Sequence, residues 1–174
     1  CQGHIRAGDS YELCLTDQSI VSYEEGTQPN SFELYKRLRS FNPAPFGAFL
    51  RLQEKTKEKK TGITVLSSSP ERFLSWSRTG KCQFRPIKGT VEKKNGLTRK
   101  EAEALLNVDK ERAENLMIVD LIRHDLHGVV GSGNVKVEKL MAVEEYQTVF
   151  QLVSVIEGQL QEGSRHTAID VLAA

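Results

Sequence analysis

The sequence predicts an α+β fold with antiparallel sheets, because it contains two hairpin-like strand pairs and one long, largely apolar helix. The predicted strands, taken in pairs, are 46–52 with 63–68 and 69–76 with 81–86. Thr79 and Gly80 form the turn of the second pair. The helix is predicted over 109–127, where apolar side chains recur at helical spacing. Strands joined by short turns pair antiparallel, so we expect antiparallel sheets.

Chain length and composition indicate one domain and argue against several classes of partner. With 174 residues, 39% of them hydrophobic, the chain can bury the core of a single domain. The 24 basic and 23 acidic residues give a net charge of +1, so neither a nucleic acid nor an anionic membrane is expected as a partner. The 3 scattered cysteines fit a reducing compartment, and no apolar run approaches the roughly 20 residues of a spanning helix. We expect a cytoplasmic location, or a plastid if the source is a plant.

Shorter patterns predict the remaining elements and the state of the two ends. A helix tail stops at Gly8, and the stretch 146–160 is either one long strand or a strand that turns into a helix. The other predicted elements are a strand over 9–16, a helix over 31–39 with Ser31 as its N-cap, a strand over 135–138 and a helix that starts at 167. No stop signal follows this last helix, so we expect residues 1–174 to be a partial domain, truncated at both ends.

The helix over 109–127 places a carboxylate where an interior position is expected. Asp109 is its predicted N-cap. One stripe of this helix contains Glu111, Glu114, Ile118, Leu121 and Asp125. Glu114 lies in line with apolar residues that should face the interior, so its carboxylate needs a partner. Two interpretations remain open: an ion pair with Arg112 or Arg123, or a bound divalent cation.

Lys88 stands in the hexapeptide Arg85-Pro86-Ile87-Lys88-Gly89-Thr90, whose chemistry suits a strand edge that touches a ligand. Gly89 lacks the Cβ that would keep a ligand away from the backbone. A lysine amine is nucleophilic only when it is neutral, which burial or a nearby cation such as Arg85 favours. The alternative is a solvated lysine in a proline-glycine turn. Glu71, on the paired segment of the hairpin, reaches the same place if both side chains share one face of the sheet.

Taken together, several segments resemble the chorismate-utilising enzymes over nearly the whole chain. The segments are 8–16, 69–73, 85–90, 109–121, 123–126 and 151–154. Within that family the sequence is most similar to the aminodeoxychorismate synthases, because Lys88 stands where the sister anthranilate synthases typically carry alanine. The resemblance implies part of a four-layer fold, in which two antiparallel sheets pack face to face with helices outside.

The resemblance also implies a covalent mechanism and a set of site residues. The Lys88 amine is expected to attack C2 of the chorismate ring while the C4 hydroxyl leaves, after which ammonia enters at C4 and expels the lysine. Glu71 matches the family's acid/base, and Glu114 matches one ligand of a Mg2+ ion that neutralises the ring carboxylate. Gly89 and Thr90 are expected to contact the same carboxylate. The ammonia is expected from a glutaminase subunit or a fused glutaminase domain.

Some family features differ or are missing, so other functions stay open. Gln151 replaces a histidine of the family, and neither the arginine for the substrate side chain nor the second magnesium glutamate has a counterpart before Ala174. Whether the segment alone is active is therefore open. One alternative is anthranilate or isochorismate chemistry on the same fold. The other is a non-catalytic remnant that serves as an interaction scaffold.

Overall fold

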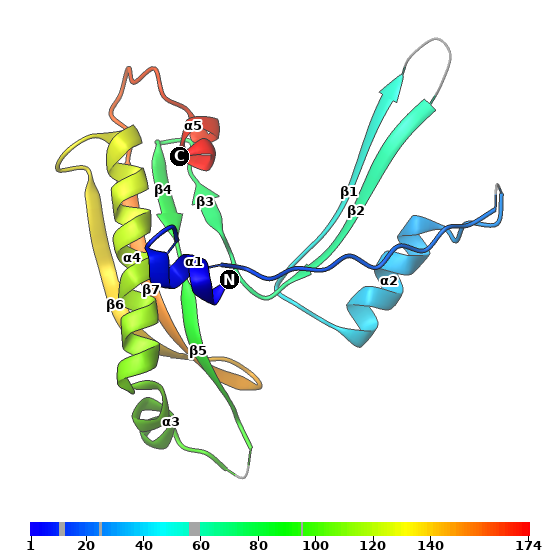
Figure 1. The fold of residues 1–174 in the computed structure, drawn as a ribbon. Coiled ribbons are helices and arrows are strands. Elements are labelled where there is room, and N and C mark those ends of the chain that lie inside the picture. Colours follow the sequence, from blue (N-terminus) through cyan, green and yellow to red (C-terminus); the bar gives the residue numbers. More distant parts are fainter. Residues whose placement is uncertain (11–12, 25, 56–59, 95) are drawn as a thin grey trace.

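The structure, a computed structural model, describes residues 1–10, 13–24, 26–55, 60–94 and 96–174. Helices and strands alternate irregularly along the chain (Figure 1). In chain order the elements are α1 (Gln2–Ala7), α2 (Ser31–Phe41), β1 (Phe46–Lys55), β2 (Lys60–Ser69), β3 (Leu74–Trp76), β4 (Lys81–Phe84), β5 (Ile87–Glu92), α3 (Arg99–Leu106), α4 (Asp109–Val130), β6 (Val135–Glu145), β7 (Val149–Gln159) and α5 (Ala168–Ala173). Among the described helices, none combines the length and the apolar character needed to cross a bilayer.

A five-stranded antiparallel sheet forms the larger part of the molecule, and β7 is its central strand (Figure 1). β4 and β5 follow each other along one side of β7, while β6 pairs along the other side. β3 extends the sheet beyond β4 as an outer strand. The start of β5, which carries Lys88, therefore lies beside the middle of the central strand.

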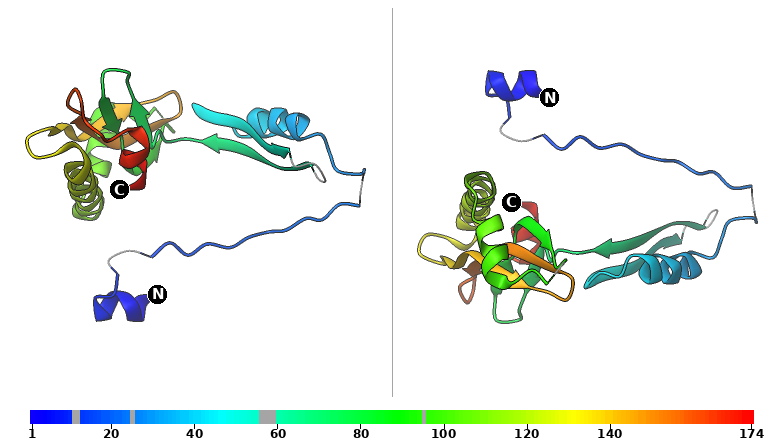
Figure 2. Two further views of the ribbon diagram at one scale, coloured as in Figure 1. Left: turned by 90° about the horizontal axis from the view of Figure 1, so that it is seen from above. Right: turned by 90° about the horizontal axis from the view of Figure 1, so that it is seen from below.

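The core lies between this sheet and α4, which covers one of its faces (Figure 2). The buried residues of this cluster are Cys82, Phe84, Val119, Leu126, Val130, Ile156, Leu160 and Val171. A second buried cluster, beneath α3, consists of Ala102, Leu106, Phe150 and Leu152. Residues 152–156 of β7 are all buried, so this strand is covered on both of its faces. Removing this apolar surface from water supplies the main stabilisation of the unit.

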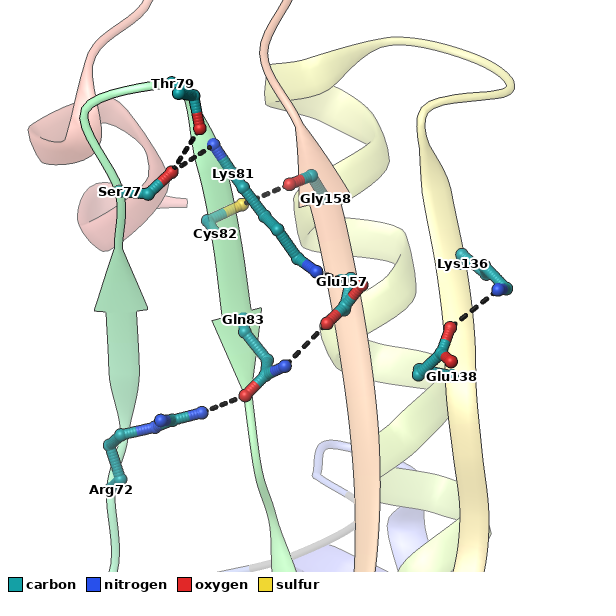
Figure 3. Close-up of polar contacts among 10 residues, drawn as sticks. All are labelled: Arg72, Ser77, Thr79, Lys81, Cys82, Gln83, Lys136, Glu138, Glu157 and Gly158. Atoms are coloured by element: carbon teal, nitrogen blue, oxygen red, sulfur yellow. Dashed lines mark hydrogen bonds and ion pairs between the residues drawn. The ribbon is translucent and has the colours of Figure 1, made fainter.

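The face of the sheet away from α4 carries a ladder of polar contacts (Figure 3). Arg72 donates to Oε1 of Gln83, whose Nε2 donates to Oε1 of Glu157 at 2.6 Å. The ammonium of Lys81 lies 2.8 Å from Oε2 of the same glutamate. The hydrogen bond from Lys81, assisted by Gln83, lowers the pKa of Glu157 below its ordinary value. Residues alternate between faces along a strand, so Lys81 and Gln83 face away from the buried Cys82.

β1 and β2 form a separate two-stranded sheet that, together with α2, stands apart from the five-stranded sheet (Figures 1 and 2). One face of this hairpin packs on α2 through Phe32, Tyr35 and Phe49, whose ring centroids lie between 5.3 and 6.3 Å apart. The other face presents Leu50 and Ile63, which are 53% and 67% exposed. Within the described chain, this face leaves apolar surface in contact with water.

Two predicted helix caps and one predicted strand are wrong. Asn30, not Ser31, caps α2, because its Oδ1 accepts from the backbone N–H of Phe32 at 2.9 Å. At α4 the N-cap is Val108, which offers no side-chain acceptor, and Asp109 is already the first helical residue. The described residues of 9–16 form no strand, and 11–12 lie outside the description. A lone extended segment lacks the neighbour that would satisfy its backbone groups.

The strand predicted over 69–76 forms only at its end, as β3, while Glu71 lies in the unpaired segment before it. The remaining predicted elements are confirmed, and one helix was not predicted. β6 is longer than the strand predicted over 135–138. β7 shows that the stretch 146–160 is a strand and not a strand that turns into a helix. The last helix starts with a capping box between Thr167 and Asp170. α3 was missed although its sequence carries the same signal: Thr98 accepts from the backbone of Glu101, and the Glu101 carboxylate accepts from Thr98.

The predicted α+β class with antiparallel sheets is confirmed. The face-to-face packing that the resemblance implied is not formed between the two sheets described here, because the hairpin points away from the five-stranded sheet (Figure 2). The segment 70–73 leaves the end of β2 and enters the edge of the other sheet, and it carries the hairpin outward (Figure 1).

Candidate functional site

Glu71 and the Lys88 segment meet where the chain leaves the hairpin and enters the five-stranded sheet. The carboxylate Oε1 of Glu71 accepts a hydrogen bond from the backbone N–H of Ile87 at 2.8 Å. The backbone carbonyl of Glu71 accepts in turn from the hydroxyl of Ser69 at 3.0 Å. A carboxylate is therefore held one residue from Lys88. The sequence left open whether Glu71 reaches the Lys88 segment, and the fold places its carboxylate against the backbone of the residue before Lys88.

Lys88 and Gly89 occupy a β-bulge. In the pairing of β5 with β7, Ile87 lies opposite Val153 and Thr90 lies opposite Gln151. The two residues between Ile87 and Thr90 therefore face a single residue of β7. Gly89 has a φ of 85°, in the left-handed region where a residue without a Cβ is favoured. Bulges of this kind redirect side chains and often lie beside functional sites. Lys88 itself is half-buried, so it is not a fully solvated lysine in a turn.

A second carboxylate lies against the backbone of this bulge. A Cβ placed on Gly89 would stand 3.0 Å from Oε2 of Glu111 and 3.0 Å from Cδ2 of Leu106. Glu111 belongs to the first turn of α4 and is half-buried. Sequence reasoning put Glu111 in the same helical stripe as Glu114 but gave it no role. The spacing of three residues between them was the signal that was available.

Glu114 does not face the core, and this part of the prediction is wrong. The buried positions of α4 are Asn115, Val119, Leu126 and Val130, one residue further round the helix than the predicted stripe. Glu114 is half-buried, with 42% of its side chain exposed, and its carboxylate lies 3.8 Å from the ammonium of Lys110. The partner of Glu114 is thus Lys110 and neither of the predicted arginines, Arg112 and Arg123.

The two arginines have other partners. Arg112 donates to Oδ1 of Asn107, and Arg123 pairs with Asp120 at 3.3 Å. Arg85, a candidate perturber of Lys88, instead pairs with Glu144, whose Oε2 also accepts from the hydroxyl of Tyr146 at 2.8 Å. Burial, followed by the contact with Glu144, raises the pKa of Tyr146.

The predicted stripe of α4 borders the site instead of the core. At its start Glu111 touches the bulge. Further along, Ile118 and Leu121 line a hollow of about 350 Å³ together with Glu71. The remaining lining residues are Ser69, Arg72, Phe73, Phe84, Pro86 and Ile122. Glu114 lies between these two parts, one turn after Glu111 and one turn before Ile118. Four of the five stripe residues thus follow one edge that runs from the Lys88 bulge to the Glu71 hollow.

Thr90 and Gln151 form a cross-strand pair beside the bulge. The amide Nε2 of Gln151 donates to the hydroxyl of Thr90 at 3.3 Å. The next residue, Val91, packs against the cluster beneath α3, so by alternation the Thr90 side chain lies on the other face of the sheet. A ligand bound over the bulge on the α3 side would therefore meet the backbone of residue 90 and not its hydroxyl.

The donors available for a metal are carboxylates. In the described part of the chain, no group of three or more histidine, cysteine, aspartate or glutamate side chains is assembled for a metal ion. Glu111 and Glu114 are two acidic side chains on one edge of α4. Mg2+ keeps several waters and needs only one or two protein carboxylates when a substrate supplies further oxygens. This donor set is compatible with magnesium shared with an anionic ligand.

Comparison with known proteins places the chain in a family. The family model described as "chorismate binding enzyme" matches residues 1–174. A putative aminodeoxychorismate synthase of Schizosaccharomyces pombe is 43% identical over 173 residues, covering 99% of this chain and 22% of that protein. Aminodeoxychorismate synthase component 1 of Salmonella typhimurium is 41% identical over 175 residues, covering 99% of this chain and 35% of that protein.

A solved structure is similar as well. The crystal structure of anthranilate synthase component I from Streptococcus pneumoniae aligns with a TM-score of 0.60 and 29% sequence identity, covering 84% of this chain and 29% of that one. The chain spans only part of each of these relatives. Because the family model matches its whole length and the structural similarity agrees, the chain belongs to the chorismate binding enzyme family.

Proposed function

We propose that the protein carrying this chain converts chorismate and ammonia to 4-amino-4-deoxychorismate, the precursor of para-aminobenzoate in folate synthesis. The observation that carries the proposal is the hydrogen bond from the N–H of Ile87 to Glu71. It puts a carboxylate beside the bulge that presents Lys88, which is the pairing that an amine nucleophile and a leaving hydroxyl require. The relatives named aminodeoxychorismate synthase support the choice of product.

Lys88 acts as the nucleophile in this proposal. Its neutral amine forms a bond to C2 of the ring, the ring π electrons shift, and the C4–O bond breaks. Ammonia then forms a bond to C4, the π electrons shift back, and the C2–N bond breaks to release the lysine. The bulge supports this role, because it interrupts the regular pairing of β5 at Lys88 and holds this residue half-buried next to the Glu71 contact.

Glu71 supplies the proton in the first step. Hydroxide is a poor leaving group, so the departing C4 oxygen takes a proton from the Glu71 carboxyl and leaves as water. After the step Glu71 is a carboxylate and can accept a proton from the attacking nitrogen. The contact with Ile87 orients this side chain toward the Lys88 segment.

Glu114, with Glu111 beside it, is the proposed holder of Mg2+. The bound cation supplies charge neutralisation of the ring carboxylate, which stabilises negative charge on the substrate. Glu114 is partly open to solvent and its contact with Lys110 is long, so its oxygens are available to a hard cation. Gly89, which has no Cβ, lets the Glu111 carboxylate approach the backbone of the bulge, and its backbone N–H and that of Thr90 are the proposed contacts of the substrate carboxylate.

A glutaminase is the proposed source of ammonia, either as a separate subunit or as a domain fused to the same protein. Free ammonia is a small fraction of the ammonium pool at neutral pH, so a coupled glutamine hydrolysis raises its local concentration. The location of the reaction is proposed to be the cytoplasm, or a plastid in a plant.

Trapping the covalent intermediate tests the proposal. The full-length protein is incubated with chorismate and Mg2+ in the absence of ammonia and glutamine, digested, and mapped by mass spectrometry. A ring adduct on the Lys88 peptide, absent from Lys88→Ala and retained in Lys93→Ala, supports the reaction. Lys93 is the matched control because it lies just beyond the end of the same strand and is paired with Glu145. Product formation by Lys88→Ala at the unmodified rate would overturn the proposal.

The likeness to an anthranilate synthase component supports a second candidate on the same fold. The product separates the two: 4-amino-4-deoxychorismate retains the side chain of chorismate, whereas anthranilate does not. Chromatography of the reaction mixture from chorismate, Mg2+ and ammonium distinguishes them directly. A protein that binds no chorismate in the presence of Mg2+ by calorimetry would instead be the non-catalytic scaffold.

A further inference from the structure

Two polar side chains are completely buried at the interface between α4 and the sheet. Asn115 of α4 and Ser154 of β7 are both 0% exposed, and they are the buried polar residues of the described chain. The hydroxyl of Ser154 donates to Oδ1 of Asn115, and Oγ of Ser154 accepts from the backbone N–H of Met141 at 2.9 Å. The pair therefore joins α4, β7 and β6 through one hydroxyl group.

The third partner is held in an unusual conformation. Met141 has a φ of 52°, the one positive φ of a non-glycine residue in the described chain. It lies where the pairing of β6 with β7 shifts register, between Lys139 and Ala142. A left-handed conformation is unfavourable for a residue with a side chain and persists only where its surroundings impose it. Ser154 provides that constraint by accepting the Met141 N–H.

The same pair also reaches both sides of the candidate site. The backbone N–H of Ser154 donates to the carbonyl of Pro86 at 3.2 Å, two residues before Lys88. Asn115 directly follows Glu114 and lies one helical turn after Glu111. A continuous set of hydrogen bonds therefore links the part of α4 that carries the two carboxylates to the strand that carries the bulge.

The pair has features that do not favour stability. The Nδ2 group of Asn115 is buried and has no hydrogen-bond partner. A buried donor without a partner is destabilising, and an apolar residue of similar size would avoid the penalty. Unfavourable features such as this unpaired buried donor are typically kept where a functional site needs a particular geometry.

We propose that Asn115 and Ser154 are positioning residues, which set the separation between the carboxylates of α4 and the Lys88 bulge. This role rests on the proposed function, because the separation matters only if Lys88 and Glu114 act on one substrate. Neither residue touches the reacting atoms. Their hydrogen bonds hold β5 and α4 in one relative register, so that the nucleophile and the cation reach the same ring.

The test compares two variants of equal shape in the full-length protein. Ser154→Thr and Ser154→Val add the same methyl group to the buried site, but only threonine keeps the hydroxyl. We expect Ser154→Val to lower kcat at least about tenfold relative to Ser154→Thr and to raise the Mg2+ concentration that gives half-maximal activity, as expected for misplaced catalytic groups. Asn115→Leu, which removes the amide, should resemble Ser154→Val. Val130→Ala, a core change away from the site, should lower stability and leave kcat and the Mg2+ dependence unchanged.

A second readout needs neither substrate nor metal. The rate at which acetic anhydride modifies Lys88, followed by mass spectrometry of its peptide as a function of pH, reports the surroundings of the amine. Ser154→Val and Asn115→Leu should change this profile, whereas Ser154→Thr and Val130→Ala should not. Identical profiles, or equal kcat for the threonine and valine variants, would overturn the inference. If the parent protein lacks turnover while the profiles differ as expected, the hydrogen bonds of Asn115 and Ser154 do set the surroundings of Lys88, and it is the proposed reaction that fails.

Discussion

The two sheets of this molecule are built from the same kind of antiparallel strand, yet they differ in how they are covered. In the five-stranded sheet the central residues Val153 and Ile156 are 1% and 0% exposed, and α4 covers one face. In the hairpin, Leu52 and Ile63 are 65% and 67% exposed, and only the face toward α2 is packed. A two-stranded hairpin is at best marginally stable, whereas a sheet of three or more strands with a covering helix is stable.

This difference explains how the candidate site is supported. Lys88, Gly89, Glu111 and Glu114 all belong to the well-packed unit, through β5 and α4. Glu71 belongs to the segment that leaves the hairpin and is attached to that unit by its contact with Ile87. Motions of the hairpin are therefore expected to affect the acid/base more than the nucleophile. The proposed nucleophile and the proposed proton donor belong to parts of the molecule that differ in how well they are packed.

The largest expected difference between the two regions concerns truncation of a large side chain. Phe150→Ala removes a ring that is 1% exposed and should lower the free energy of unfolding by about 4 kcal/mol. Leu52→Ala removes a side chain that is 65% exposed and should change it by less than about 0.5 kcal/mol. Urea unfolding followed by the fluorescence of Trp76, which lies in β3, measures both. Equal losses would show that the hairpin is buried in solution.

A smaller effect is expected at the bulge, where the two regions meet. Gly89→Ala combines a φ of 85° with contacts of 3.0 Å to Glu111 and Leu106, so it should cost about 2 kcal/mol. Gly133→Ala is the matched control, because its φ is 81° but nothing lies within 4 Å of the added Cβ. The control should cost about 1 kcal/mol from backbone conformation alone. The same urea experiment applies, and equal costs would mean that the bulge yields to the new methyl group.

Loss of a helix N-cap should destabilise its own helix equally in the two regions, but only one of the two losses should lower the global free energy of unfolding. Thr98→Ala breaks the capping box of α3, and Asn30→Ala removes the acceptor at the start of α2; each should cost about 1 kcal/mol in its own helix. Because α3 packs on the buried cluster with Phe150, the loss at Thr98 should appear in global unfolding. The loss at Asn30 should appear only as faster hydrogen exchange in α2. A global loss from Asn30→Ala would contradict the independence of the hairpin.

The smallest effect expected is a pH dependence confined to the five-stranded sheet. Because the folded pKa of Glu157 is lowered, its contribution is present above the unfolded value of about 4.3 and is lost as the pH falls through the lower folded value. Lys81→Met removes the leading cause of the shift and should weaken this acid sensitivity by less than about 1 kcal/mol. Hydrogen exchange of β7 and of the hairpin, compared at pH 6 and pH 3.5, provides the measurement. A larger increase in hydrogen exchange at pH 3.5 in the hairpin than in β7 would contradict the assignment of the acid sensitivity to Glu157.

Much of the fold follows from local patterns in the sequence. Alternation and turn residues located both hairpins, and helical spacing located α4, because these signals depend on neighbours within a few residues. The capping box at Thr98 was an equally local signal for α3 that went unused. The strand predicted over 9–16 failed for a different reason. A strand needs a partner, and a pattern within one segment does not show whether one is present.

The sequence by itself determined the local chemistry of this protein: a lysine followed by glycine in an extended segment, and acidic residues spaced along one helix. Only the tertiary structure decided which of these groups meet. The bulge at Lys88, the contact of Ile87 with Glu71 and the approach of Glu111 to Gly89 depend on strand register and on how α4 lies on the sheet. A rotation of one residue around α4 separates the predicted stripe from the buried one, and that rotation is set by packing between segments distant in the chain.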